Sequence, residues 1–471
     1  MSKIRIVTAA SLFDGHDAAI NIMRRIMQSK GAEIIHLGHN RSVHEIVECA
    51  IEEDAHGIAI TSYQGGHVEF FKYMKDLLNE NGCGHIKIFG GGGGTILPQE
   101  IDELHHYGIH KIYSPDDGRK LGLEGMIQEV IDACAPGENK EGAKNNFWQA
   151  PKNWESKLPL QEVKDIRKIA RAITLCELGM EVPENFIADE STGAVVLGFT
   201  GTGGAGKSSV TDEFVRRYLN NFTDKTVAVI SVDPSKKKTG GALLGDRIRM
   251  NAISHTRAYM RSMATRDDNT ALSGYVQEAI DICKKAGYDL VILESAGVGQ
   301  SDASILDYCD LSMYVMTPEY GAASQLEKIN MLDYADVICI NKFDKAGALD
   351  AYNDVCKQYK RNHQLFAAKN EDVPVVGTIA SQFNDAGITK LFTKLLQVIQ
   401  EKTGKTFGEI SASTDGEATT KSLVIPAKRV RYLSEITDAI RGYNKWANDQ
   451  SDIATKLYQL NGTIEMMEKE K

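Results

Sequence analysis

Eight consecutive residues in the middle of the chain have the composition of a phosphate-binding loop. Residues 201–208 read Gly-Thr-Gly-Gly-Ala-Gly-Lys-Ser and fit the pattern G-x-x-x-x-G-K-[ST]. Glycines let successive backbone N–H groups curl around phosphates, Lys207 supplies a positive charge for the β- and γ-phosphates, and the Ser208 hydroxyl can ligate Mg²⁺. We therefore predict that a nucleoside triphosphate binds to Gly203, Gly204, Ala205, Gly206, Lys207, Ser208 and Ser209.

A second group of residues is suited to recognise the base. Asn341-Lys342-Phe343-Asp344 follows the apolar run Val337–Ile340 and fits N-K-x-D. A carboxylate such as Asp344 only accepts hydrogen bonds, so it can take both N–H groups of guanine, which adenine does not offer in that arrangement. The pattern favours GTP over ATP and predicts a base site at Asn341, Lys342, Phe343 and Asp344.

Three carboxylates follow apolar runs or lie on a nearby loop, where they could hold a metal ion. Asp233 and Glu294 each end a strand-like run, and the carboxyl ends of parallel strands are where α/β sheets bind their ligands. Asp246 adds a third carboxylate beside Arg247 and Arg249, which we expect to reach the phosphates. A carboxylate in such a place can instead cap a helix. The residues expected to act in hydrolysis are Lys207, Asp246, Arg249 and Glu294.

A separate constellation lies near the N-terminus. Asp14-Gly15-His16 follows the apolar run Ile4–Ala10, which places His16 at the carboxyl edge of a sheet. Neutral imidazole is a good ligand for cobalt, and Asp14 can fix its tautomer from the other ring nitrogen. Ser62 follows the third apolar run, and the glycine row Gly90–Gly94, which includes Gly91 and Gly92, follows the fourth. Backbone without side chains lets a bulky ligand approach closely.

The elements that must position these residues form two β/α series. In residues 1–135 five short apolar runs alternate with amphipathic stretches, which predicts a flavodoxin-like, doubly wound parallel sheet. A domain of that fold could equally be a receiver or a flavin binder, although a receiver would need an aspartate where Ser62 stands. The five runs are Ile4–Ala10, Glu33–Leu37, Gly57–Ser62, Ile86–Phe89 and Lys111–Tyr113.

The second series begins after a Gly-, Asn- and Lys-rich linker and a helical stretch at about residues 160–178. It predicts a P-loop α/β domain that ends in a helix at Thr389–Glu401, then a polar connector and an amphipathic helical tail. We predict a cofactor domain at 1–135, a linker at 136–160, a nucleotide domain at 161–402, and a connector with a tail at 403–471. The predicted strands are Ala194–Phe199, Thr226–Val232, Leu290–Glu294, Leu311–Met316, Val337–Ile340 and Val375–Thr378.

Composition narrows the class of protein. The 471 residues carry a net charge of −10, so no uniform basic field is available to hold a nucleic acid. The eight cysteines form no C-x-x-C pair, which argues against a disulfide framework or a zinc site. The N-terminus reads as a strand and not a signal peptide, and no apolar run approaches the roughly 20 residues that span a bilayer. We expect a cytoplasmic protein without membrane or nucleic-acid partners.

Five ordered motifs in residues 160–400 resemble the GTPase chaperones of cobalamin-dependent acyl-CoA mutases. They are Gly201–Ser208, Asp233–Ser235, Gly240–Met250, Glu294–Gln300 and Asn341–Asp344. The resemblance implies Mg²⁺ held by Ser208, Asp233, Asp246 and Glu294, guanine held by Asn341 and Asp344, and switch segments around Gly240–Met250 and Gly297–Ser301. Ser295-Ala296 departs from the Thr-Val that is common there.

Residues 3–135 resemble the cobalamin-binding domain of methylmalonyl-CoA mutase and its relatives, with the pattern D-x-H-x-x-G, S-x-L, G-G. Ala19 and Gln64 depart from that pattern. The order of the two domains is similar to that of the fused isobutyryl-CoA mutases. This resemblance implies His16 as the lower axial cobalt ligand, Asp14 as its orienter, and Ser62, Gly91 and Gly92 along the nucleotide tail of adenosylcobalamin.

The barrel that binds acyl-CoA in such mutases takes about 250 residues and does not fit into residues 403–471. The chain is therefore expected to work with a barrel domain or subunit, as a homo-oligomer in the complete enzyme. A free GTP-dependent carrier or loader of cobalamin is the alternative. A metallochaperone GTPase is a weaker one, because no His- or Cys-rich metal site lies near Gly201.

Overall fold

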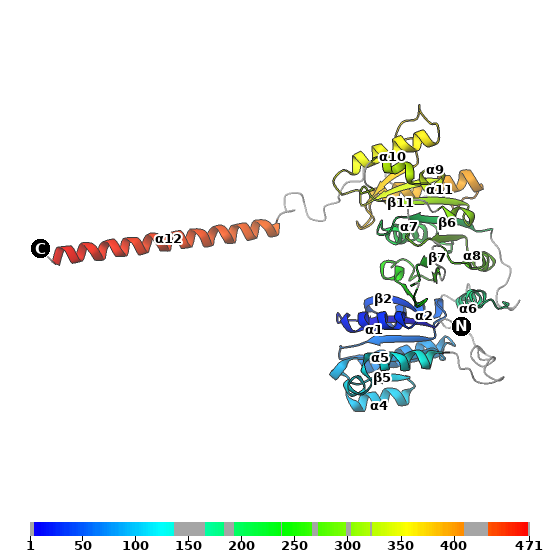
Figure 1. Ribbon diagram of the computed structural model, residues 1–471, viewed down its shortest axis with the longest axis horizontal. Coiled ribbons are helices and arrows are strands. Elements are labelled where there is room, and N and C mark those ends of the chain that lie inside the picture. Colours follow the sequence, from blue (N-terminus) through cyan, green and yellow to red (C-terminus); the bar gives the residue numbers. More distant parts are fainter. Residues whose placement is uncertain are drawn as a thin grey trace. The chain divides into compact units, whose positions relative to one another are not determined.

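The computed structural model describes residues 4–135, 165–182, 193–236, 238–265, 272–297, 303–320, 323–408 and 432–469. Residues 1–420 form one unit and residues 421–471 a second. The first unit holds two parallel sheets with helices on their faces, so the predicted α/β class is confirmed (Figure 1). The predicted linker 136–160, residues 298–301 of one predicted switch, and the predicted connector beyond residue 408 lie outside the described residues.

The first sheet has the strand order β5-β4-β3-β1-β2-β8. Its first five strands follow the flavodoxin-like order, with parallel pairing throughout. Its strands are β1 (Arg5–Ser11), β2 (Glu33–Arg41), β3 (Gly57–Thr61), β4 (Lys87–Gly91), β5 (Lys111–Tyr113) and β8 (Ala242–Leu244). The helices around it are α1 (Ala18–Ser29), α2 (Val43–Glu52), α3 (His67–Glu80), η1 (Gly93–Thr95), α4 (Pro98–Tyr107) and α5 (Pro115–Cys134).

The second sheet is parallel as well, in the order β13-β12-β11-β6-β10-β7-β9. Its strands are β6 (Val195–Gly201), β7 (Val227–Asp233), β9 (Ala258–Ala264), β10 (Leu290–Glu294), β11 (Leu311–Met316), β12 (Val337–Asn341) and β13 (Val375–Thr378). The accompanying helices are α6 (Ile166–Glu177), α7 (Lys207–Asn221), η3 (Asp246–Arg249), α8 (Val276–Lys285), η4 (Ser304–Asp307), η5 (Ala323–Lys328), α9 (Met331–Tyr334), α10 (Ala348–Asn362) and α11 (Ala386–Thr403).

The strands are apolar runs because helices cover both faces of each sheet. Every residue of β1, β6 and β10 is buried. Helix starts follow local capping chemistry: the Ser42 hydroxyl accepts from the N–H of Glu45, and the Glu45 carboxylate accepts from the N–H of Ser42. At α11 the Asp385 carboxylate accepts from the N–H of Ile388. The predicted strands, which were based on apolar runs, lie within a few residues of the observed ones.

Two strands of the structure were not predicted. The strand β9 carries Arg261 in its middle, which breaks the apolar run that would reveal it, yet this arginine is fully buried. The strand β8 has only three residues and follows the second domain's β7 along the chain. It nevertheless pairs in parallel with β2 of the first sheet, with Ile34 opposite Leu243. The chain after β7 therefore supplies the edge strand of the first sheet.

The tail forms one helix, α12 (Tyr432–Lys469), as predicted. Its described side chains are almost all exposed, and apolar ones such as Trp446, Leu457 and Ile464 recur along it. Across the described ranges, no helix combines the length and apolar character that crossing a membrane requires.

Candidate functional site

The phosphate-binding loop joins the buried strand β6 to α7, and two of its glycines are required by close neighbours. At Gly201 the backbone has a φ of +150°, and a Cβ atom would lie 2.0 Å from the carbonyl oxygen of Val315. At Gly206 the φ is +91°, and a Cβ atom would lie 2.5 Å from Nδ2 of Asn341. A side chain at either position would collide with atoms of neighbouring strands. The loop is therefore held against the carboxyl ends of β11 and β12.

The Ser208 hydroxyl lies between two carboxylates at the start of α7. Its Oγ is 2.8 Å from Oε1 of Glu294 and 3.0 Å from Oδ1 of Asp246. The other oxygen of Glu294 accepts from the Thr211 hydroxyl at 3.1 Å, and Asp246 also accepts from Ser231. Three of the four residues predicted to hold Mg²⁺ are thus in direct contact, and hydroxyl and carboxylate oxygens are the ligands that Mg²⁺ prefers.

The fourth predicted residue, Asp233, lies close by, and its Oδ2 accepts from the N–H of Gly245 at 3.0 Å. Burial and the charge of Asp246 raise the pKa of Asp233 to about 7. The same two causes raise the pKa of Glu294 to about 8. A cation bound between these carboxyl groups would favour their ionised form.

Within the described ranges, no group of three or more His, Cys, Asp or Glu side chains is arranged to hold a metal ion. The nucleotide site does not need such a group, since Mg²⁺ usually takes one or two carboxylates together with phosphate oxygens and water.

The base-recognition segment follows β12, on the same sheet edge. Asn341 is buried, and its Nδ2 donates to the carbonyl of Ala205 in the phosphate loop at 2.8 Å. Lys342 has a φ of +60°, and its Nζ donates to the carbonyl of Gly204. Asp344 is exposed beside them. Asn341 and Lys342 thus tie the predicted base site to the phosphate site, although 136 residues separate Asn341 from Ala205.

The cobalamin site predicted from the sequence is built around Asp14. This carboxylate is buried and accepts three hydrogen bonds: from the backbone N–H of His16 at 2.8 Å, from Nδ1 of its imidazole at 2.9 Å, and from the N–H of Tyr63 at 2.7 Å. Burial raises the pKa of Asp14, but these hydrogen bonds lower it by more, so the group is ionised. The His16 side chain is 76% exposed and lies near the ring of Tyr63. Its Nε2 is therefore available for a metal.

The glycine row has more than one structural role. A Cβ atom on Gly92 would lie 2.0 Å from the carbonyl oxygen of Ser62, so the protein's own packing requires this glycine. At Gly91 a Cβ atom would make only ordinary contacts, and at Gly94 it would meet nothing within 4 Å. Gly91 and Gly94 therefore leave space along the backbone for a ligand.

The hydroxyl groups at the end of β3 differ from expectation. Ser62 is fully buried, and its Oγ accepts from the Ser11 hydroxyl at 3.0 Å. The neighbouring Thr61 was not predicted, yet its Oγ1 is buried without a hydrogen-bond partner. A buried hydroxyl without a partner is costly, and a ligand can satisfy it. The oriented imidazole, the open glycines and this hydroxyl fit a cobalamin with a long polar tail.

Known protein families match both halves of the chain. Residues 169–450 match the family described as "Methylmalonyl Co-A mutase-associated GTPase MeaB", which covers more than half of the chain. The chain belongs to this GTPase family. Residues 4–114 match the family described as "B12 binding domain", so this member of the MeaB family carries a cobalamin-binding domain before its GTPase domain.

Relatives of this MeaB-family chain align with nearly all of it. It is 52% identical to the "Fused isobutyryl-CoA mutase" of Geobacillus kaustophilus, over 98% of this chain and 42% of that protein. It is 50% identical to the protein of the same description from Cupriavidus metallidurans, over 99% of this chain and again 42% of the relative. The predicted resemblance to fused isobutyryl-CoA mutases is confirmed. The chain spans less than half the length of these relatives.

The prediction for Arg247 of this MeaB-family chain was wrong. We expected it to reach the phosphates, but it is buried and its guanidinium forms ion pairs with Glu52 and Glu53 of the cobalamin-binding domain. In the short helix η3 successive side chains point in different directions, so Asp246 and Arg247 face different partners. Arg249 is exposed at the end of η3, and its charge lowers the pKa of Asp233, which places it near the metal carboxylates.

Sequence reasoning missed one segment of the MeaB-family nucleotide site. The loop after β13 lies against the base segment, where the N–H of Ala380 donates to Oδ1 of Asn341 at 3.0 Å and the Thr378 hydroxyl donates to the same oxygen at 3.2 Å. Residues 379–384 contain no charged side chain that would mark this loop. The signal that could have found it is its position after the strand next to β12.

Proposed function

We propose that this chain binds adenosylcobalamin through His16 and hydrolyses GTP with Mg²⁺ at the phosphate loop, as the cofactor-holding and GTPase portion of an acyl-CoA carbon-skeleton mutase. The observation that carries the proposal is the exposed His16 imidazole, oriented by the ionised and buried Asp14. A carboxylate on one ring nitrogen leaves the other as a basic metal ligand.

The nucleotide half works by positioning and charge. Ser208, Asp246, Glu294 and the nearby Asp233 would hold Mg²⁺ on the β- and γ-phosphates. Lys207 would neutralise charge that develops on the transferred phosphoryl group, and Arg249, exposed beside the site, would add to it. Asp344 would select guanine. Phe343 supports the segment, because its ring packs edge-to-face on Tyr352 and closely over Gly377.

The cofactor half contributes binding and orientation. Bound adenosylcobalamin supplies radical chemistry through its cobalt–carbon bond. His16 would bind cobalt, Thr61 would donate a hydrogen bond to the polar tail, and Gly91 and Gly94 would let that tail lie against the backbone. Ser62 and Gly92, which the sequence assigned to the tail, would instead pack against each other and support the strand ends that the tail contacts.

The substrate would bind to a part of the relatives that lies outside the region aligned with this chain. We propose an acyl-CoA of the isobutyryl/n-butyryl type, bound by a barrel domain or subunit, with the complete enzyme a homo-oligomer in the cytoplasm. The GTPase half would gate or protect the cofactor.

The deciding test is an optical titration of the chain with adenosylcobalamin. Displacement of the cofactor's own base by His16 shifts the visible spectrum to the base-off form, and His16→Ala should abolish that shift. A wild-type complex that keeps the base-on spectrum would refute His16 as the cobalt ligand, and absence of any complex would refute the cofactor assignment. GTP turnover is measured in parallel as Mg²⁺-dependent phosphate release. Rearrangement that appears only when a barrel subunit is added would exclude a free cofactor carrier.

A further inference from the structure

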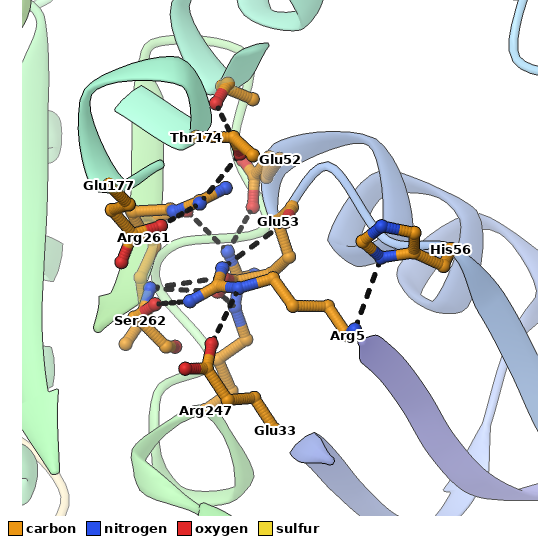
Figure 2. A network of polar contacts seen from close by, with 12 residues as sticks. Arg5, Glu33, Glu52, Glu53, His56, Thr174, Glu177, Arg247, Arg261 and Ser262 are labelled. Atoms are coloured by element: carbon orange, nitrogen blue, oxygen red, sulfur yellow. Dashed lines mark hydrogen bonds and ion pairs between the residues drawn. The ribbon is translucent and has the colours of Figure 1, made fainter. Parts of the chain in front are cut away.

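A buried cluster of arginine and glutamate side chains joins the cobalamin-binding half (residues 4–135) to the GTPase half (residues 165–408), and neither proposed site uses it. Figure 2 shows its side chains, which come from β1, β2, the end of α2, η3, β9 and α6. Every member has less than a tenth of its surface exposed. Its ionisable members are Arg5, Glu33, Glu52, Glu53, Glu177, Arg247 and Arg261.

Glu53 lies at the centre of the cluster and receives only donors. Its Oε1 accepts from Nε of Arg247 and from the N–H of Ser262, both at 2.9 Å. Its Oε2 accepts from Nη1 of Arg5 at 2.9 Å and from the same N–H at 3.2 Å. Burial raises the pKa of Glu53, but the charges of Arg247, Arg5 and Arg261 lower it by more, so the carboxylate is ionised. An amide in its place would turn an N–H group toward a donor.

The segment that contains Arg247 alternates between the two halves. Ala242–Leu244 pairs with β2 of the cobalamin-binding sheet, and Gly245 donates to the metal carboxylate Asp233. Asp246 contacts Ser208 at the phosphate loop, and Arg247, the next residue, is held by Glu53. Cα atoms of successive residues are about 3.8 Å apart, so a shift of the backbone at Arg247 also displaces Asp246.

We propose that Glu53, a residue of the cobalamin-binding half, is a positioning residue for the GTPase: by holding Arg247 it keeps Asp246 against the Ser208 hydroxyl, where Mg²⁺ binds. This inference rests on the proposed Mg²⁺-dependent hydrolysis of GTP. It implies that the cobalamin-binding half completes the metal site of the other half, and that a displacement of α2 relative to η3 weakens Mg²⁺ binding before it weakens guanine binding.

The test uses the full chain with Glu53→Gln. The Mg²⁺ concentration that gives half-maximal GTP hydrolysis should rise about tenfold, the lower end of what loss of an outer support costs in metal affinity. The affinity for GDP in the absence of Mg²⁺ should stay within about twofold, since the base and phosphate loops are untouched. The matched control is Glu177→Gln, which removes a carboxylate from the same cluster but from Arg261, and should leave the Mg²⁺ requirement unchanged.

Circular dichroism and thermal unfolding of each variant report whether the chain is folded. If Glu53→Gln does not fold, Arg247→Lys decides instead, because it keeps the charge but loses the fork that reaches both Glu52 and Glu53. Equal Mg²⁺ requirements for the wild type, Glu177→Gln and whichever of the two other variants folds would overturn the positioning role. Absence of Mg²⁺-dependent hydrolysis in the wild type would instead overturn the proposed function.

Discussion

The two candidate sites differ in how far their key side chains are buried and hydrogen-bonded. At the nucleotide site Ser208, Glu294 and Asn341 are buried. Ser208 is hydrogen-bonded to Glu294, and Asn341 is hydrogen-bonded to the phosphate loop. At the cobalamin site only the support is assembled: Asp14 is buried with three donors, while the ligand His16 is mostly exposed. A small, charged ligand is met by a preorganised shell, whereas a large cofactor can bury its own ligand when it binds.

The largest effect is expected at the preorganised site. Lys207→Ala should lower kcat for GTP hydrolysis by about 10²–10³-fold, because the charge that meets the developing phosphoryl charge is lost. Cobalamin binding should stay unchanged, since Lys207 lies in the other half of the chain. Phosphate release and an optical cobalamin titration measure the two quantities. Loss of cobalamin binding in this variant would show that the sites are not assembled separately.

The exposed ligand predicts a different pattern. His16→Ala should weaken cobalamin binding by about 10–100-fold and remove the base-off spectrum, while the free energy of unfolding changes by less than about 0.5 kcal/mol. Calorimetric titration and denaturant unfolding test both, with the exposed His106→Ala as the control. A large loss of stability would contradict an open, unassembled ligand.

Within the base-recognition segment, Asp344 is exposed while Asn341 is buried, so a change at Asp344 should affect base selection without disturbing the packing of the segment. Asp344→Asn should reduce the preference for GTP over xanthosine triphosphate by about tenfold or more, since one acceptor of guanine N–H groups becomes a donor. The ratio of kcat/KM for the two nucleotides measures this. Equal turnover of ATP and GTP by the wild type would rule out guanine recognition.

The smallest expected effect concerns communication between the sites. If the segment 240–250 responds to the γ-phosphate, cobalamin affinity should differ by about fivefold between the GDP-bound and the non-hydrolysable GTP-bound chain. Titration calorimetry with no nucleotide, with GDP and with the analogue measures it, and Glu53→Gln should reduce the difference. Three identical affinities would mean that the chain is uncoupled without a barrel.

The sequence alone determined those parts of the protein whose chemistry is contiguous. Residues 201–208 and 341–344 each carry their full pattern within eight residues, so spacing sufficed to predict a GTP site. The prediction of His16 as a cobalt ligand needed a family resemblance in addition to residues 14–16. The two parallel sheets followed from apolar runs that are buried on both faces. The limits of this approach appear at Ser62, where adjacent hydroxyls look equivalent in sequence and only the contacts of the folded chain separate the partnered Ser62 from the unpartnered Thr61.

Only the tertiary structure decided how the two halves meet. Arg247 and Glu53 are 194 residues apart, and no local pattern links them, so the sequence assigned the arginine to the phosphates. A three-residue strand has too few side chains to show a periodicity, and β8 joins β2 only because the edge of that sheet lies beside it. The partner of a buried charge is chosen by which opposite charges the fold brings within hydrogen-bond distance, and that choice is made in three dimensions.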